Sequence, residues 1–315
     1  MSDLAPAVAN VIRRCLDVKP GENVLVITDA KKRALGEALR DEAAAAGADA
    51  VLAVMDERAT DGTEPPPPIA AALAACDVFI APTSRSLSHT TARKRASEAG
   101  ARGATMPGVT EEMLARVMAV DFDTMAARSR AVAALLSTGA SARITCPLGT
   151  DLTLDLTGRE GLPDDGSLSE RGAFGNLPAG EGFISPVGGE GTAVVASLAP
   201  LGLTVERATL TLRGGHLVAA EGGLAPEYLS RLTAHGEMGT NLAELGVGTN
   251  DRAILTGNVL EDEKILGTVH IAFGASAGIG GNVSVPIHLD SVVLDATLEV
   301  DGVQVLDAGA FVLPV

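Results

Sequence analysis

The chain has 315 residues, of which 46% are hydrophobic and 20% charged, which is enough to bury a sizeable core in one or two domains. This composition excludes a disordered protein. A formal net charge of −16 and an aromatic content of 2% disfavour nucleic acid and anionic membranes as partners. Three widely spaced cysteines without a CxxC motif argue against a disulfide framework or a cysteine-rich zinc site.

The N-terminal sequence MSDLAPAVANVIRRC places acid before base and has no long apolar stretch, unlike a signal peptide. No segment reaches the roughly 18 apolar residues of a membrane span. We therefore expect a cytoplasmic protein.

The first part of the chain alternates between apolar runs and helical stretches. Asn23–Thr28 is a β-branched run typical of a buried strand, and the Ala-rich stretch Lys31–Ala46 stops before Gly47, as helices do. Strands separated by helices indicate parallel crossovers, so we predict a doubly wound parallel α/β domain. No G-x-G-x-x-G motif follows the first strand, so a nucleotide site is not indicated. Further strands are predicted at 50–54, 77–81 and 104–106, and further helices at 4–17, 110–117 and 123–136.

Strand-like alternation dominates the chain after Ser137-Thr138-Gly139. The pattern predicts strands at 142–146, 151–156 and 208–212. A hairpin is predicted from a strand over 291–300, a turn at Asp301-Gly302 and a return strand over 303–306. We place the domain boundary near residue 138, with an α/β domain over residues 1–138 and a β-rich metal-site domain over residues 139–315.

Four segments of the second part place metal-binding residue types in Gly-rich or apolar surroundings. His288 and Asp290 are two residues apart, so on a strand both side chains point to one face. His270 and Glu244 lie in apolar stretches, where an unpaired carboxylate costs several kcal/mol. Sharing cations would lower that cost, which predicts a metal centre. The segments are NLPAGEGF at 176–183, GTNLAELGVGTN at 239–250, DEKILGTVHIAFG at 262–274 and IHLD at 287–290.

In order and spacing these segments resemble the aminopeptidase T, or thermophilic metallopeptidase, family over most of the C-terminal half. The resemblance implies a homodimer with an N-terminal α/β domain. It also implies that two ions of zinc, cobalt or manganese activate a water that removes N-terminal residues from peptides. We therefore predict a metallohydrolase for a short peptide or related amide. The ligands that the resemblance implies are Glu181, Glu244, His270, His288 and Asp290.

Two features depart from that family's pattern. A family tyrosine follows the histidine of the third segment, but this chain has Ala277 there, and its only tyrosine is Tyr228. The chain is also shorter than typical members. A protein that binds a metal or small ligand without turnover is therefore one alternative to the hydrolase.

A second alternative is an enzyme with one metal ion. A related group, resembling 2,5-dihydroxypyridine 5,6-dioxygenase, uses a single Fe(II) held by two histidines and one aspartate. In this chain His270, His288 and Asp290 would supply that set. A one-iron site does not require Glu181 and Glu244, so their presence favours the two-metal hydrolase.

Two more residues are candidates for catalysis. His89 follows the third predicted strand, where open α/β sheets bind ligands, and is a candidate acid, base or substrate anchor. Alternatively, Ser88 or Thr90 caps the next helix and His89 is structural. Glu263 is a candidate general base beside the metal, with a solvated turn as the alternative interpretation.

Overall fold

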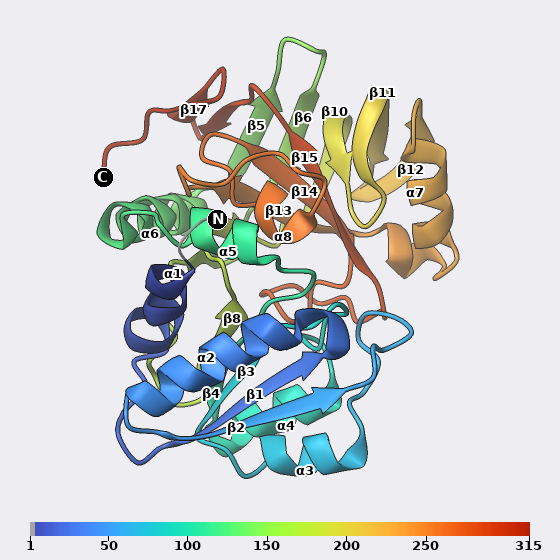
Figure 1. The fold of residues 1–315 in the computed structure, drawn as a ribbon. Helices are drawn as coiled ribbons and strands as arrows, with labels where there is room; N and C mark the ends of the chain where they lie inside the picture. Colours follow the sequence, from blue (N-terminus) through green and yellow to red (C-terminus); the bar gives the residue numbers. More distant parts are fainter. Residues whose placement is uncertain (1–3) are drawn as a thin grey trace. The chain divides into compact units, whose positions relative to one another are not determined.

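The computed structural model describes residues 4–315, which form two compact units (Figure 1). One contains the residues up to Val120 together with Gly166–Ala179, and the other contains Asp121–Asp165 and Gly180–Val315. The units therefore do not divide at residue 138. Helix α6 (Phe122–Thr138) belongs to the second unit because its apolar side chains join that unit's core, and residues 166–179 return to the first because they carry a strand of its sheet.

The first unit is a five-stranded parallel sheet with helices on both faces, so the predicted doubly wound α/β fold is confirmed. The strand order is β2-β1-β3-β4-β8. Its strands are β1 (Asn23–Asp29), β2 (Asp49–Met55), β3 (Val78–Ala81), β4 (Arg102–Thr105) and β8 (Phe174–Asn176). Its helices are α1 (Ala5–Ala9), η1 (Asn10–Cys15), η2 (Ala30–Lys32), α2 (Arg33–Ala45), α3 (Pro67–Leu73), α4 (Thr91–Ala99) and α5 (Glu111–Val117).

Alternating strand residues separate the two helical layers of this unit. Leu25 and Ile27 of β1 join one buried cluster with Ile69 of α3 and Ala96 of α4. Helix α2 lies along the opposite face of β1 and β2 (Figure 1). The short strand β8 has the sequence Phe-Gly-Asn, too short and too glycine-rich to give a strand pattern, and the sequence did not predict it.

The second unit is a curled, mainly antiparallel sheet, as predicted for a β-rich domain. The main strand order is β18-β17-β16-β5-β6-β10-β15-β14-β13-β9-β7, with β11 and β12 continuing from β10. The strands are β5 (Ser141–Thr145), β6 (Asp151–Asp155), β7 (Gly161–Asp164), β9 (Glu181–Ile184), β10 (Gly188–Leu198), β11 (Gly202–Arg213), β12 (His216–Glu221), β13 (Leu242–Gly248), β14 (Val269–Gly274), β15 (His288–Val293), β16 (Thr297–Val300), β17 (Val303–Asp307) and β18 (Ala310–Phe311). Its helices are α6, α7 (Ala225–Thr233), η3 (Glu237–Thr240) and α8 (Val259–Asp262).

One prediction for this unit is wrong in detail. The stretch 291–300 is not a single strand, because β15 ends at Val293 and β16 begins at Thr297. Asp295 lies between them with a φ of 51°, a left-handed conformation that interrupts an extended strand. The predicted hairpin is confirmed between β16 and β17, with its turn at Asp301-Gly302.

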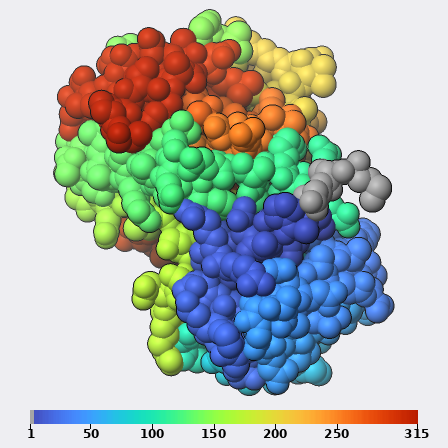
Figure 2. Space-filling view, turned by 60° about the vertical axis from the view of Figure 1, so that its left-hand side comes forward, coloured from blue at the N-terminus to red at the C-terminus, as the bar shows by residue number. Residues whose placement is uncertain are grey.

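The core of the second unit joins the sheet to α6. Val132 and Leu136 of α6 lie in one buried cluster with Ile184, Leu245 and Ile271 from the central strands. The C-terminal strands, in red, lie beside α6, in green, in Figure 2. The guanidinium of Arg128 in α6 lies 5.9 Å from the ring centroid of Phe311 in β18.

No helix among residues 4–315 combines the length and the hydropathy that crossing a bilayer requires.

Arg102 of β4 fastens the N-terminal helix to the parallel sheet. Its guanidinium donates to Leu16 O at 2.8 Å and forms a two-pronged pair with the Glu22 carboxylate at 2.7 and 2.8 Å. The side chain is only 10% exposed, and its hydrogen bonds lower the pKa of Glu22.

Replacing Arg102 with Ala is expected to destabilise the first unit by about 3 kcal/mol, because buried acceptors lose their donor. Denaturation in urea measures the change. Arg231→Ala removes an exposed pair with Glu227 and serves as the control, with no measurable shift expected. Equal effects of the two variants would contradict this account.

Candidate metal centre

One face of four neighbouring antiparallel strands carries the polar cluster. Across β9, β13 and β14, Phe183 pairs with Gly246 and Gly246 with His270. Across β13, β14 and β15, Glu244 pairs with Ala272 and Ala272 with Asp290. Paired residues in an antiparallel sheet point to the same side, so these side chains share one face, and the residues between them point into the core. The predicted ligands on this face are Glu181, Glu244, His270, His288 and Asp290.

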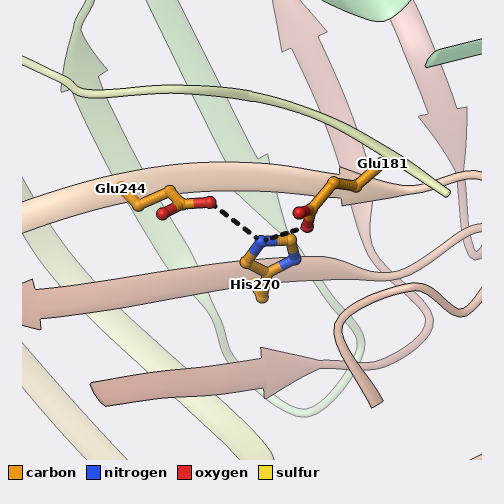
Figure 3. A group of neighbouring side chains, drawn as sticks. All are labelled: Glu181, Glu244 and His270. Atoms are coloured by element: carbon orange, nitrogen blue, oxygen red, sulfur yellow. Dashed lines mark hydrogen bonds and ion pairs between the residues drawn. The ribbon is translucent and has the colours of Figure 1, made fainter. Parts of the chain in front are cut away.

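The imidazole of His270 lies between two carboxylates, as Figure 3 shows. Its Nε2 atom is 3.0 Å from Glu181 Oε2 and 3.3 Å from Glu244 Oε1. The ring lies over Gly246, since a Cβ atom built there would be 2.0 Å from Nε2. Glycine at this position therefore provides the space that the imidazole occupies.

His288 is oriented for binding through Nε2. Its Nδ1 atom is 2.7 Å from Ala275 O, and because a carbonyl can only accept, Nδ1 carries the proton and donates. Nε2 then points to Glu244 Oε2 at 3.3 Å and Asp290 Oδ1 at 3.6 Å. A backbone contact of this kind fixes the tautomer of a metal-binding histidine.

Potential ligand atoms gather in two groups that share Glu244. Glu181, Glu244 and His270 form one group, Glu244, His288 and Asp290 form the other, and the ligand atoms within each group lie within 4.8 Å of one another. Among residues 4–315, no hydrogen-bond donor is found for the buried Glu181 Oε2, which lies near His270 Nε2 but outside hydrogen-bond geometry. Two imidazole nitrogens gathered with carboxylate oxygens around Glu244 are a donor set that fits a divalent transition metal.

The electrostatics also favour a cation at this point. Burial by itself would lower the pKa of His270 and His288, but the neighbouring carboxylates outweigh burial and raise both pKa values well above the usual range. Burial opposes ionisation of Glu244, yet contacts with both imidazoles lower its pKa. The carboxylates therefore require positive charge, which protonated imidazoles or a metal ion supply.

Lys264 is a buried cation that the sequence analysis missed. Its side chain is 1% exposed, and its Nζ donates to Glu181 Oε1 and lies 2.9 Å from Glu263 and 3.1 Å from Asp164. Burial would lower the pKa of Lys264, but the three carboxylates raise it well above the usual value. The Asp-Glu-Lys run resembled a solvated turn, and the one available signal was the apolar Ile-Leu that follows it.

Gly248 explains how Lys264 reaches the cluster. A Cβ atom at Gly248 would lie 2.0 Å from Ile265 O, so the chain after α8 passes directly over this glycine. Asp164 of β7 pairs with Glu181 of β9, which places both carboxylates on the face that Lys264 approaches. Lys264 thus shares Glu181 with His270 and connects the cluster to α8.

Glu263 lies at the edge of this arrangement. Its side chain is 12% exposed, so it is not in a solvated turn. Burial raises the pKa of Glu263 to about 8, with Lys264 acting against the rise, and burial likewise raises the pKa of Asp164 to about 6. Glu263 contacts Lys264 directly, and Lys264 in turn contacts Glu181.

His89 belongs to the first unit, whereas the polar cluster belongs to the second. It lies exposed in the turn before α4. Thr90 is the N-cap of that helix, because its Oγ1 accepts from Arg93 N. The cap is therefore Thr90, and not Ser88.

The cluster has no tyrosine hydroxyl of the kind that the aminopeptidase T pattern has, because Ala277 stands at that position and Tyr228, the chain's one tyrosine, makes a different contact. Ala277 is exposed in the loop between β14 and β15. Tyr228 is fully buried in α7, and its hydroxyl donates to Leu289 O at 2.6 Å, a backbone atom between His288 and Asp290. Its role in this structure is to support β15.

Fold and cluster together define a two-unit α/β protein with a candidate metal centre on its antiparallel sheet. Comparison with known families gives the particular assignment: the profile of the 2,5-dihydroxypyridine 5,6-dioxygenase (NicX) family matches residues 3–313, and the chain belongs to that family. No curated protein sequence matches significantly.

Two solved structures share the fold. The 2,5-dihydroxypyridine dioxygenase of Pseudomonas putida KT2440 superposes with a TM-score of 0.83 at 21% identity, covering 99% of this chain and 97% of that one. AmpT from Thermus thermophilus superposes with a TM-score of 0.71 at 20% identity, covering 98% of each chain. The resemblance to the aminopeptidase T family is thus a likeness of fold.

The family assignment overturns the predicted reaction. The metallohydrolase, aminopeptidase and metalloprotease assignments are wrong, because the matching family over nearly the whole chain is a dioxygenase family. A centre of two zinc, cobalt or manganese ions has no support either. The prediction of two ions rested on the presence of Glu181 and Glu244. In the structure Glu181 is paired with Lys264, so its burial does not require a second ion.

Replacing Gly246 with Ala is expected to push the His270 ring away and to lower the affinity for a divalent metal ion at least about tenfold, while leaving most of the stability. Metal titration monitored by calorimetry measures the affinity. Gly188→Ala, where a Cβ atom meets nothing within 4 Å, is the matched control. Unchanged affinity in Gly246→Ala would contradict a role of His270 as a ligand.

Replacing Lys264 with Met is expected to cost about 3–5 kcal/mol of stability, because Glu181 and its neighbours lose a buried counter-charge. Thermal and urea unfolding measure the loss. Adding Glu181→Gln should recover part of it, since the carboxylate to which Lys264 donates then no longer needs compensation. A fully stable Lys264→Met protein would show that these carboxylates are neutral.

Proposed function

We propose that this chain is an Fe(II)-dependent dioxygenase that opens a hydroxylated aromatic ring of the dihydroxypyridine type. The observation that carries the proposal is the family match over residues 3–313. The two histidines and one aspartate on adjacent strands support it, because that ligand set is typical of non-haem iron oxygenases.

In this proposal His270, His288 and Asp290 hold a single ferrous ion. His270 Nε2 lies 3.3 Å from Glu244 Oε1, and His288 Nε2 lies 3.3 Å from Glu244 Oε2, so both imidazoles face the same carboxylate. Asp290 Oδ1 lies 3.6 Å from His288 Nε2 and adds the third donor. Glu244 lies between the two imidazoles as a further oxygen ligand or charge partner.

When bound, ferrous iron supplies the redox chemistry by which dioxygen reacts with an electron-rich ring. Both oxygen atoms enter the product as one ring bond breaks, so no external reductant is required. The chain's own residues hold the site in place: Ala275 O fixes the His288 tautomer, and Lys264 keeps Glu181 ionised beside His270.

Two residues keep a proposed part in proton transfer. Glu263, whose pKa is raised to about 8, is a candidate to exchange a proton with Lys264, which it contacts at 2.9 Å. His89, exposed before α4, remains a candidate acid, base or substrate anchor.

The direct test is oxygen uptake with 2,5-dihydroxypyridine after anaerobic loading with Fe(II). Loading should saturate at a single iron per chain. His288→Ala and Asp290→Ala should each lower the rate about 100-fold or more, because a ligand is lost. His235→Ala, an exposed histidine outside the cluster, is the matched control and should keep full activity.

Glu181→Gln separates this proposal from other metal centres. It should still bind its iron, since Glu181 is assigned to Lys264 and not to the metal. Absence of ring-dependent oxygen uptake in the iron-loaded wild type would overturn the proposed function.

A further inference from the structure

Phe183 of β9 and Ser185, which directly follows β9, lie near the polar cluster but are not metal-ligand types. Phe183 and Ser185 alternate with Ile184, which is buried in the core. They therefore point to the same side of the strand as Glu181. Phe183 pairs with Gly246, and continuing that register places Ser185 opposite Glu244.

Phe183 and His270 lie in the same row of paired residues across β9, β13 and β14. Gly246 separates the two residues, and the imidazole of His270 occupies the space above this glycine. Phe183 is half-buried, whereas Phe79 and Phe273 are fully buried in their cores. In a chain with six phenylalanines and one tyrosine, an aromatic ring next to the metal-site histidine is a distinctive feature of this face.

Ser185 is a buried hydroxyl in need of a partner. It is 1% exposed, and its Oγ has no hydrogen-bond partner among residues 4–315. Leaving such a group unsatisfied costs free energy, which a bound polar ligand would recover.

The loop between β14 and β15 lies beside both Ser185 and His288. A Cβ atom at Gly281 would lie 2.4 Å from Ser185 Oγ and 2.2 Å from Ser276 Oγ, so both hydroxyls adjoin this loop. The same loop contains Ala275, whose carbonyl accepts from His288 Nδ1. Arg159 donates to Gly280 O at 2.9 Å and connects this loop to the segment between β6 and β7.

From this placement we propose that Phe183 and Ser185 form the subsite that recognises the substrate ring. Phe183 contacts the face of a planar aromatic ring, and Ser185 Oγ hydrogen-bonds one exocyclic oxygen of that ring. The inference rests on the proposed dioxygenase function and names its substrate class, a hydroxylated aromatic ring that lies over the face of the sheet formed by β9, β13, β14 and β15. Both residues determine specificity and leave metal binding to the other strands.

Equilibrium binding without oxygen tests the role of Ser185. The Fe(II)-loaded protein is titrated under argon with 2,5-dihydroxypyridine, 2-hydroxypyridine and 3-hydroxypyridine, the last two each lacking one hydroxyl. Ser185→Ala should weaken binding of the dihydroxylated ring about five- to tenfold. The effect should disappear for the analogue that lacks the contacted oxygen. Equal weakening for all three ligands, or none, would overturn the assignment of Ser185.

A non-aromatic metal ligand tests Phe183. Phe183→Leu should weaken binding of all three rings about tenfold, because the stacking surface is lost, and should leave the binding of oxalate unchanged. Equal binding of the rings by Phe183→Leu and wild type would overturn the assignment. Phe311→Leu and Ser141→Ala, the same substitutions away from the site, are matched controls, and iron content is measured for every variant.

Oxygen uptake measured in parallel separates this inference from the proposed function. Uptake by wild type together with unchanged binding in both variants overturns the subsite alone. Ring binding that depends on Phe183 and Ser185, without oxygen uptake, supports the subsite and overturns the reaction. An iron-loaded wild type that binds none of the rings overturns both.

Discussion

The burial of several carboxylates on one face of an antiparallel sheet is the constraint on which the rest of the site depends. Glu181, Glu244 and Asp290 are each less than a tenth exposed. Such groups are stable only when positive charge lies beside them. The structure supplies one buried cation, Lys264, on one side, and two imidazoles on the other, where a metal ion can replace the charge of their protons.

Strand register explains how residues from short, separate segments form one polar cluster. Because paired residues of β9, β13, β14 and β15 face the same way, short segments far apart in the sequence place their polar side chains together. Gly246 and Gly248 are as important as the ligands, because one leaves space for the His270 ring and the other lets the chain carrying Lys264 pass. The intervening residues supply the core that keeps the strands in register.

The sequence predicted the α/β and β-rich parts and the residues of the cluster, because strand periodicity and polar residues in apolar runs are local signals. It did not predict Lys264, whose pairing with Asp164 depends on a contact across 100 positions, nor strand β8, which is too short to show a pattern. The reaction was assigned wrongly for the same reason. Glu181 and Glu244 were interpreted as ligands of a second ion. The partner of Glu181 is Lys264, which the sequence analysis did not recognise because it follows Asp262 and Glu263 in a polar run.

In the proposed function a single iron lies beside Glu181, which is paired with Lys264. The most direct measurement is a crystal structure of the anaerobically Fe(II)-loaded protein, with anomalous scattering recorded at the iron edge. We predict one anomalous peak per chain, bonded to His270, His288 and Asp290, with Glu181 still paired to Lys264. Two peaks bridged by Glu244, or a peak bonded to Glu181 with Lys264 displaced, would contradict the account.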